Sequence, residues 1–344
     1  MTNNESLRFP AEWEHSDAIL ISWPHENTDW QYILEKVTKC YVDIVCAITE
    51  FMPMIIVTPC IDIVKNSLPD DVLGKVLIYQ VPTNDTWARD FGPITMLDKA
   101  GKPTILDFKF NAWGLKFAAD KDNLITHNLI FQKAFNYNYQ NHLGFVLEGG
   151  SIETDGNGLL LTTSECLLSL NRNGDKTKDE IELYLKSALN IKKVLWLDHG
   201  YLAGDDTDCH IDTLARLAPN NTIIYVKCDN PEDEHFDELY KMENQLKQMT
   251  DLSDNHFNLV PLPLPDPIFE DGERLPATYA NYLVTEKAVF IPIYGQEKDS
   301  IAVKQIQKVY KDKKCVTVDC NALICQHGSL HCVTMQIFGN FTKD

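Results

Sequence analysis

The chain has 344 residues, of which 44% are hydrophobic and 10% aromatic, so it can bury a sizeable core and is unlike a disordered chain. Lys and Arg number 31 against 50 Asp and Glu, and the formal net charge of -19 disfavours nucleic acid and anionic membrane surfaces as partners. The same charge weakly favours a cationic ligand, although many acidic proteins use their charge only for solubility.

The length fits either two domains or one large α/β domain, and no low-complexity linker divides the chain. The first ten residues lack the basic start and apolar run of a secretory signal, and no stretch approaches 18 uninterrupted apolar residues. We therefore expect a cytoplasmic protein without a membrane span. In that compartment the ten cysteines would be reduced thiols rather than a disulfide scaffold.

Short runs rich in β-branched and aromatic residues recur along the chain and predict strands, and apolar residues at helical spacing between them predict helices. This alternation indicates a mixed α/β fold. The predicted strands cover residues 18–23, 54–58, 75–81, 104–110, 194–197, 222–227, 288–293, 315–319 and 333–338. The predicted helices cover residues 31–51, 179–189, 231–250 and 300–310.

Two local signals sharpen this prediction. Thr177 and Glu180 have the spacing of a capping box, which predicts a helix start at this point. Residues 155–158, Asp-Gly-Asn-Gly, lie between two apolar runs. They lack the ligand spacing of a calcium loop, so they predict a hairpin turn instead.

The first of four polar segments covers residues 83–93 and contains Trp87, Arg89 and Asp90. Charged and aromatic residues after a strand, followed by Gly-Pro, are typical of a rigid binding loop, although an ordinary turn with a surface ion pair fits as well.

In the second segment, residues 147–151, an apolar run leads into Glu148 and two glycines. A carboxylate there is either functional or an internal hydrogen-bond partner, because a buried unpaired charge is too costly. The glycines allow close approach of the backbone, or form a β-bulge.

The third segment, residues 204–212, holds four carboxylates and one imidazole within eight residues. In an extended backbone His210 and Asp212 would point to one face, which suits an acid/base histidine beside a cation-binding carboxylate. A solvated acidic loop is the alternative.

The fourth segment, residues 326–335, places Cys332 after a Gly-Ser turn, at the start of a strand-like run. A cysteine is more often a small buried hydrophobe than a nucleophile, and a reactive thiolate needs a nearby cation. Zinc ligation is a further alternative, but the spacings fit no standard zinc motif. The candidate zinc ligands are Cys325, His327, His331, Cys332 and His210.

Taken together, these segments resemble the agmatine deiminase family, which shares its domain with the bacterial peptidylarginine deiminases. The resemblance covers nearly the whole chain, and the number and order of the motifs make it specific. Its motifs are residues 10–14, 22–25, 83–93, 147–150, 161–168, 171–173, 205–212, 275–279 and 331–332.

The resemblance implies a pentein fold, in which five ββαβ units surround a pseudo-fivefold axis and the active site lies in the central channel. It also implies one catalytic domain over residues 1–344, a small cationic guanidinium substrate, no metal or organic cofactor, and a homodimer.

The resemblance further implies a set of roles. Cys332 matches the nucleophile that forms a thiouronium intermediate, and His210 matches the acid/base group. Asp90 and Asp212 match the two carboxylates that bind the guanidinium, and Glu148 matches the residue that holds His210 and keeps its pKa raised. A planar guanidinium suits two acceptors at fixed positions.

Three further residues complete the expected site. Trp87 is expected to wall the pocket, and Asp206 lies where the family reads the far end of the substrate. We also expect Arg89 to be a substrate-binding residue.

Two departures from the family pattern bear on the substrate. The family usually carries Gly-Gly-Gly-Asn-Ile-His-Cys where this chain has His327 to Cys332, and Cys209 replaces a glycine. Agmatine is therefore the first expectation, with free or protein arginine as the alternative. A non-catalytic polyamine binder is the alternative of another class. The role of His331, catalytic or packed inward, stays open.

Overall fold

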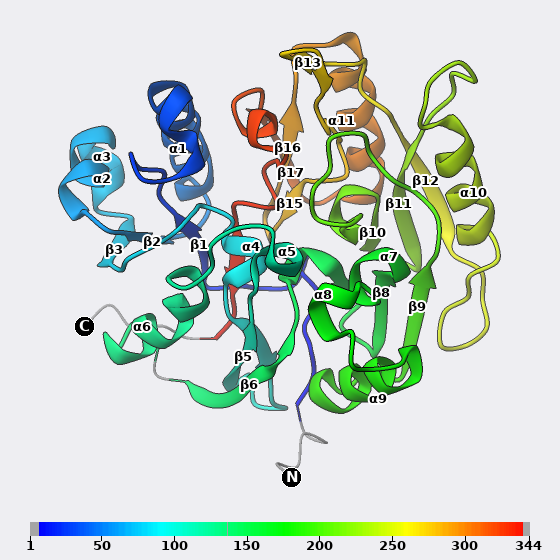
Figure 1. The fold of residues 1–344 in the computed structure, drawn as a ribbon, viewed down its shortest axis with the longest axis horizontal. Coiled ribbons are helices and arrows are strands. Elements are labelled where there is room, and N and C mark those ends of the chain that lie inside the picture. The colour runs from blue at the N-terminus through cyan, green and yellow to red at the C-terminus, as the bar shows by residue number, and fades with distance from the viewer. Residues whose placement is uncertain (1–6, 136, 340–344) are drawn as a thin grey trace.

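The computed structural model describes residues 7–135 and 137–339. Its strands form five larger sheets and one small hairpin, which follow one another around the middle of the molecule, where helices α4 and α5 lie (Figure 1). Among the described residues, no strand pairing joins one of these sheets to another. The prediction of a mixed α/β fold is confirmed.

The five larger sheets repeat one pairing pattern. In each, a central strand pairs antiparallel with one neighbour and parallel with the other. The parallel strand of each pair needs a crossover, and helices supply most of these. Four sheets are built from β4 (Ile94–Leu97), β5 (Pro103–Lys109) and β6 (Asn138–Val146); β7 (Ile152–Thr154), β8 (Leu159–Thr163) and β9 (Lys193–Leu197); β10 (Ala215–Ala218), β11 (Thr222–Lys227) and β12 (Asn258–Pro263); and β15 (Leu283–Val284), β16 (Ala288–Ile293) and β17 (Lys314–Asp319).

The remaining larger sheet joins the two ends of the described chain. It has the order β18-β1-β2-β3, with β1 (Ala18–Ser22), β2 (Met54–Thr58), β3 (Val76–Gln80) and β18 (Met335–Ile337). Strand β18 runs antiparallel to β1, with Ala18 opposite Ile337. The hairpin consists of β13 (Phe269–Glu270) and β14 (Glu273–Arg274).

The long helices pack between neighbouring sheets. Helix α1 (Leu34–Thr49) contacts β2 and β17, α11 (Glu297–Val309) contacts β17 and β12, and α10 (Phe236–Leu246) contacts β11 and β9. Helix α9 (Lys178–Leu189) begins with the predicted capping box. No described helix has the length and apolar character needed to cross a membrane. The shorter helices are α2 (Ile61–Ser67), α3 (Asp70–Leu73), α4 (Ala88–Phe91), α5 (Ala112–Leu115), α6 (Ile125–Phe131), α7 (Ser164–Leu167) and α8 (Leu170–Asn173), with 3-10 turns at Asp29–Ile33, Asp122–Leu124, Gly149–Ser151, Ile211–Thr213 and Leu323–Gln326.

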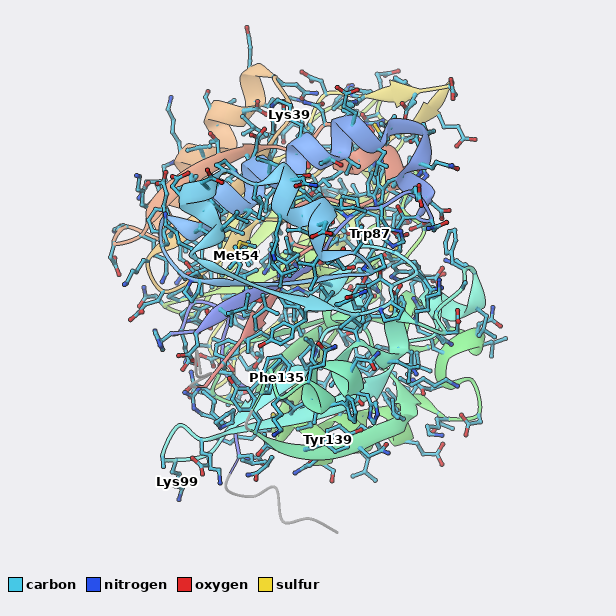
Figure 2. All side chains as sticks on the ribbon, turned by 90° about the vertical axis from the view of Figure 1, so that its left-hand side faces the viewer. Lys39, Met54, Trp87, Lys99, Phe135 and Tyr139 are labelled. Atoms are coloured by element: carbon cyan, nitrogen blue, oxygen red, sulfur yellow. The ribbon has the colours of Figure 1, made fainter. Side chains whose placement is uncertain are left out.

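Strand residues fill the interior. The side view in Figure 2 places Lys39 and Lys99 toward the outside, and both are exposed, whereas Met54 and Trp87 are buried. All five residues of β1, β2 and β8 are buried, as expected for strands covered on both faces. The predicted turn at residues 155–158 connects the antiparallel strands β7 and β8, and Gly156 and Gly158 adopt positive φ there.

Candidate active site

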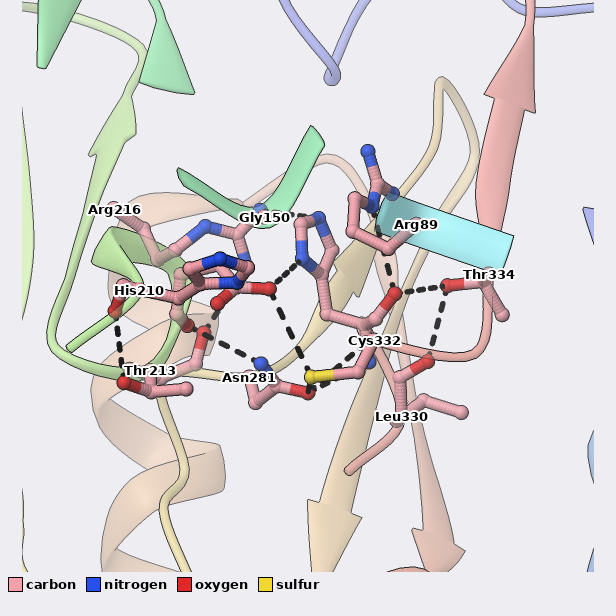
Figure 3. A network of polar contacts seen from close by, with 12 residues as sticks. Arg89, Gly150, His210, Thr213, Arg216, Asn281, Leu330, Cys332 and Thr334 are labelled. Atoms are coloured by element: carbon pink, nitrogen blue, oxygen red, sulfur yellow. Dashed lines mark hydrogen bonds and ion pairs between the residues drawn. The ribbon is translucent and has the colours of Figure 1, made fainter. Parts of the chain in front are cut away.

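The four polar segments lie in turns and a short helix between the sheets, and they meet in the interior. Asp90 lies on the short helix α4, and Glu148 directly precedes the 3-10 turn Gly149–Ser151. His210 precedes the 3-10 turn Ile211–Thr213, and Cys332 lies in the turn before β18. Figure 3 shows His210, Gly150, Asn281 and Cys332 gathered in one polar network.

Gly150 marks the point where three of these side chains converge. A Cβ atom on Gly150 would lie 2.7 Å from Nδ1 of His210, 2.8 Å from Oδ1 of Asp90 and 3.1 Å from Oδ2 of Asp212. No larger residue fits there without displacing a titratable group. The glycines of this segment therefore serve close approach, as one of the two sequence interpretations proposed.

The thiol of Cys332 lies beside two oxygen atoms. Its Sγ is 3.3 Å from Oδ1 of Asn281 and 3.9 Å from Oδ2 of Asp212. Burial, together with the negative charges of Asp212 and Asp90, raises the pKa of Cys332 well above its usual value. In this environment the sulfur remains a neutral thiol until a positive charge arrives.

The carboxylate of Asp90 is held by two donors. Oδ1 accepts a hydrogen bond from the backbone N–H of Gly150 at 2.9 Å, and Oδ2 accepts one from Nε1 of Trp113 at 2.9 Å. Burial raises the pKa of Asp90 to about 6, and the nearby His210 limits this rise. Asp90 is thus oriented rigidly and is ionised above about pH 6.

Asp212 has one occupied and one unoccupied carboxylate oxygen. Oδ2 lies 2.7 Å from Nδ1 of His331, whereas Oδ1 is buried and has no hydrogen-bond partner in the described part of the chain. Burial opposes ionisation, but the hydrogen bond and charge of His331 prevail and lower the pKa of Asp212. A buried acceptor without a partner is costly, so Oδ1 is ready to accept a donor from a ligand.

His210 is buried between acidic groups, and neither ring nitrogen has a hydrogen-bond partner among the described residues. Nδ1 lies 3.6 Å from Oδ1 of Asp90, and Nε2 lies 3.9 Å from Oε2 of Glu148. Burial alone would lower the pKa of His210, but Asp90, Cys166 and Glu148 raise it well above its usual value. The ring is therefore a cation at neutral pH and can donate a proton.

A pocket leads from the surface to this group of residues. It encloses about 380 Å³ including its open mouth. Among the described residues, no Lys or Arg lines it. Its lining consists of Asp29, Asp85, Trp87, Asp90, Trp113, Phe117, Asp206, Thr207, Gln326, His327, Gly328 and Cys332.

Trp87 forms a fixed wall of this pocket. Its Nε1 donates to Oδ2 of Asp85 at 3.0 Å, and a Cβ on Gly328 would lie 2.1 Å from the indole ring. The loop that precedes Cys332 therefore needs glycine at residue 328, because the six-membered ring of the indole lies directly against it. Asp206, which was expected to contact the far end of the substrate, and His327 both line the same pocket.

Arg89 does not line this pocket, which corrects its predicted contact with the substrate. Its guanidinium instead donates to Oε1 of Glu12 at 2.7 Å and to Oε1 of Gln336 at 2.5 Å. Its backbone N–H donates to the carbonyl of Cys332 at 3.1 Å. Arg89 faces the opposite way from its neighbour Asp90 because successive residues of a helix point in different directions.

The extended backbone predicted around His210 and Asp212 is also wrong, because Ile211–Thr213 form a 3-10 turn. Both side chains nevertheless reach the site. Glu148 lies 3.9 Å from Nε2 of His210, beyond hydrogen-bond distance, and both its oxygens accept from Nε of Arg172, at 2.9 and 3.0 Å.

Within residues 7–135 and 137–339, two groups of side chains have metal-ligating atoms close together: Glu148 with Cys166 and His210, and Glu12 with Glu153 and His331. The set proposed from the sequence, with Cys325 and His327, differs from both. Each observed group already contains an arginine ion pair, from Arg172 in the first and from Arg216 in the second. These guanidinium charges satisfy the carboxylates and oppose a bound cation.

Sequence reasoning missed several contributors as functional residues. Asn281 orients the nucleophile loop, since its Oδ1 accepts from the backbone N–H of His331 at 2.9 Å and of Cys332 at 3.3 Å. Trp113 orients Asp90. Arg172 and Glu12 lie within the family motifs at residues 171–173 and 10–14, which was the one signal that could have indicated them.

The fold and the site together define a mixed α/β protein with a cysteine, a histidine and two aspartates buried beneath an acidic pocket. Residues 8–337 match the family model of the Porphyromonas-type peptidyl-arginine deiminases, and the chain belongs to this family.

Comparisons of sequence and of structure with known proteins support this membership. A Mycoplasma mycoides protein, provisionally named agmatine deiminase, is 32% identical over 95% of this chain and 94% of its own. A Porphyromonas gingivalis protein of solved structure, provisionally named arginine deiminase, is 44% identical to this chain in sequence. The two structures match with a TM-score of 0.92 over 96% of this chain and 99% of that one. The structure of a Cys-to-Ser variant of C. jejuni agmatine deiminase with bound substrate matches with a TM-score of 0.91 and 37% sequence identity. The match covers 98% of this chain and 97% of the C. jejuni chain.

Proposed function

We propose that this protein is a hydrolase that converts agmatine to N-carbamoylputrescine and ammonia. The observation that carries the proposal is the convergence of Asp90, His210 and Asp212 on Gly150, with Cys332 beside Asp212 at the base of an acidic pocket. The family and the C. jejuni agmatine deiminase structure support the same chemistry.

Binding uses the two aspartates. The substrate guanidinium donates to the free Oδ1 of Asp212 and to Asp90, which fixes its plane beside the sulfur. The substrate's positive charge counters the negative charges that keep Cys332 protonated, so its thiol proton is released to the water of the pocket. The thiolate thus forms only when its target is present.

The chemical steps follow from this arrangement. The Cys332 sulfur bonds to the central guanidinium carbon and gives a neutral tetrahedral adduct. His210 donates its proton to one amino nitrogen, ammonia leaves, and an S-alkylthiouronium cation remains. Neutral His210 then removes a proton from water as the water oxygen bonds to the carbon. The carbon–sulfur bond breaks as the hydroxyl proton of this second adduct passes to the sulfur, which releases the neutral ureido product and restores the Cys332 thiol.

The pocket favours agmatine over free arginine. Asp29, Asp85 and Asp206 line the pocket, and among the described residues it has no Lys or Arg to receive the carboxylate of arginine. An ammonium group at the far end of the substrate meets acidic groups instead. Deimination of arginine or of protein arginine is the second candidate, favoured by the 44% identity to the P. gingivalis protein.

The repeated sheet pattern also supports a proposal about architecture. Five sheets share one pairing scheme and follow one another around the site-bearing segments. We assign them to the five units of a pentein propeller, in a single catalytic domain.

Turnover experiments test the function. Ammonia and ureido product are measured with agmatine, arginine, an arginyl peptide and butylguanidine, and kcat/KM is compared for the wild type and Cys332→Ala. We expect agmatine to be preferred and Cys332→Ala to bind it without turnover. Equal activity of the two proteins would contradict the cysteine mechanism, and binding without turnover by the wild type would indicate a non-catalytic binder.

A further inference from the structure

His331, directly before the nucleophile, points away from the substrate pocket and toward the carboxylate of Asp212. Its side chain is fully buried and is not part of the pocket lining. Nδ1 lies 2.7 Å from Oδ2 of Asp212, and the backbone N–H is fixed by Asn281. The ring therefore contacts the substrate-binding carboxylate without approaching the substrate.

Charged groups also contact the other ring nitrogen of His331, Nε2. Nε2 of His331 lies 2.9 and 3.0 Å from the two carboxylate oxygens of Glu12, and 3.0 Å from a guanidinium nitrogen of Arg216. Glu12 also forms ion pairs at 2.7 Å with Arg89 and with Arg216. A segment far from His331 in sequence thus fixes the orientation of the imidazole.

This arrangement determines which nitrogen carries the hydrogen facing Asp212. In the neutral ring, the hydrogen resides on Nδ1 because Oδ2 of the ionised Asp212 can only accept a hydrogen bond, and Nε2 accepts from Arg216. In the protonated ring, Nε2 donates to Glu12 and Nδ1 carries a hydrogen as well. In both states Nδ1–H donates to Oδ2 of Asp212, and only Oδ1 is left without a partner.

We propose that His331 is a positioning residue, held by Glu12 and Arg216, which occupies Oδ2 of Asp212 so that Oδ1 alone is presented to the substrate guanidinium. This inference rests on the proposed deiminase function. It assigns to His331 no contact with the reacting atoms. A rotated Asp212 would present neither oxygen in the plane that a guanidinium needs.

The same contact affects ionisation. His331, His210, Asp90, Cys332 and Arg216 all act on Asp212. The hydrogen bond from His331 is the main influence that lowers the pKa of Asp212 against the effect of burial. Loss of this donor raises that pKa toward the range in which Asp90 ionises. Two carboxylates must then lose protons there, so the acid limb of kcat/KM, which Asp90 sets in the wild type, moves to a higher pH.

A matched pair of variants tests the proposal. Asparagine keeps an N–H donor near the Nδ1 position, whereas leucine has a similar size and no donor. We expect His331→Leu to lower kcat/KM for agmatine about 10- to 150-fold, the range for a hydrogen bond to a charged group, and to move the acid limb upward. We expect His331→Asn to recover most of kcat/KM and the wild-type acid limb. Equal losses in both variants with an unmoved acid limb would overturn the proposal.

A second measurement is independent of turnover. In substrate-free wild type with ¹⁵N-labelled histidine, the Nδ1–H of His331 should give a strongly downfield proton resonance in the NMR spectrum. It should be absent in His331→Asn and shifted in Asp212→Asn. A resonance unchanged by Asp212→Asn would overturn the proposal, even where His331→Leu fails to fold. If the wild type does not turn over agmatine, the proposed function fails, and this resonance still decides the role of His331.

Discussion

Replacement of Arg172 by methionine should strongly destabilise the protein, because it leaves a buried carboxylate without its partner. The side chains of Arg172 and Glu148 are both fully buried, and Nε of Arg172 donates to both Glu148 oxygens. The guanidinium also donates to Asp208 at 2.5 Å and to the carbonyl of Thr207 at 2.8 Å. Methionine is unbranched, extends about as far as the Nε position of arginine, and has none of these donors.

The magnitude follows from the burial. Breaking a buried ion pair by removal of one partner costs about 3–5 kcal/mol. The contact with Asp208 adds little, because that side chain is 27% exposed and retains water. The expected loss is therefore about 3–5 kcal/mol, a large share of the roughly 5–15 kcal/mol that stabilises a typical protein.

Urea unfolding followed by tryptophan fluorescence measures this loss, with two control variants. Lys247→Met removes an ion pair with Glu243 in which the lysine side chain is 48% exposed, and it should cost less than about 1 kcal/mol. The double variant Arg172→Met with Glu148→Gln should be more stable than Arg172→Met alone, because it removes the buried charge. An Arg172→Met protein as stable as Lys247→Met would refute this reasoning.

Two further predictions concern activity. The dependence of kcat/KM on pH should be bell-shaped: it rises through about pH 6 as Asp90 ionises, and it falls at a pH above the usual histidine range, where His210 loses the proton it donates. If the acid limb of kcat/KM stays at about pH 6 in Asp90→Asn, the limb reports the ionisation of a group other than Asp90. Asp206→Asn should lower kcat/KM about tenfold or more for agmatine and leave that for butylguanidine nearly unchanged, because only agmatine carries an ammonium group for this carboxylate. Equal losses on the two substrates would exclude this contact.

The sequence predicted the secondary structure well wherever apolar patterning was continuous. The predicted strands at residues 54–58, 222–227 and 288–293 agree with β2, β11 and β16 residue for residue. The strand predicted from residue 333 begins only at Met335, because the preceding residues form a turn in which Thr334 bonds to the carbonyls of Leu330 and His331. Hydrogen bonds to side chains, which apolar patterning does not reveal, moved this boundary.

Sequence patterns indicated the segments that meet around Gly150 better than they indicated the contacts between their side chains. The segments that carry Asp90, Glu148, His210 and Cys332 stood out by their polar density. Their partners did not, because the pairing of Glu148 with Arg172, or of Asp90 with Trp113, depends on how distant segments pack. The direction of the Arg89 side chain was unpredictable for the same reason. Asp90 lines the pocket, whereas Arg89, one residue earlier on the same helix, faces Glu12.

The pairing of β18 with β1 bears on how the protein is made. The sheet formed by β1, β2 and β3 lacks an edge partner until the ribosome has synthesised residues 335–337, more than 300 positions after β1. Contacts of such long sequence separation form slowly, and the open edge is prone to pair with other chains in the meantime. Because Cys332 directly precedes β18, assembly of the nucleophile should coincide with closure of this sheet, and nascent chains should depend on protection from aggregation until translation is nearly finished.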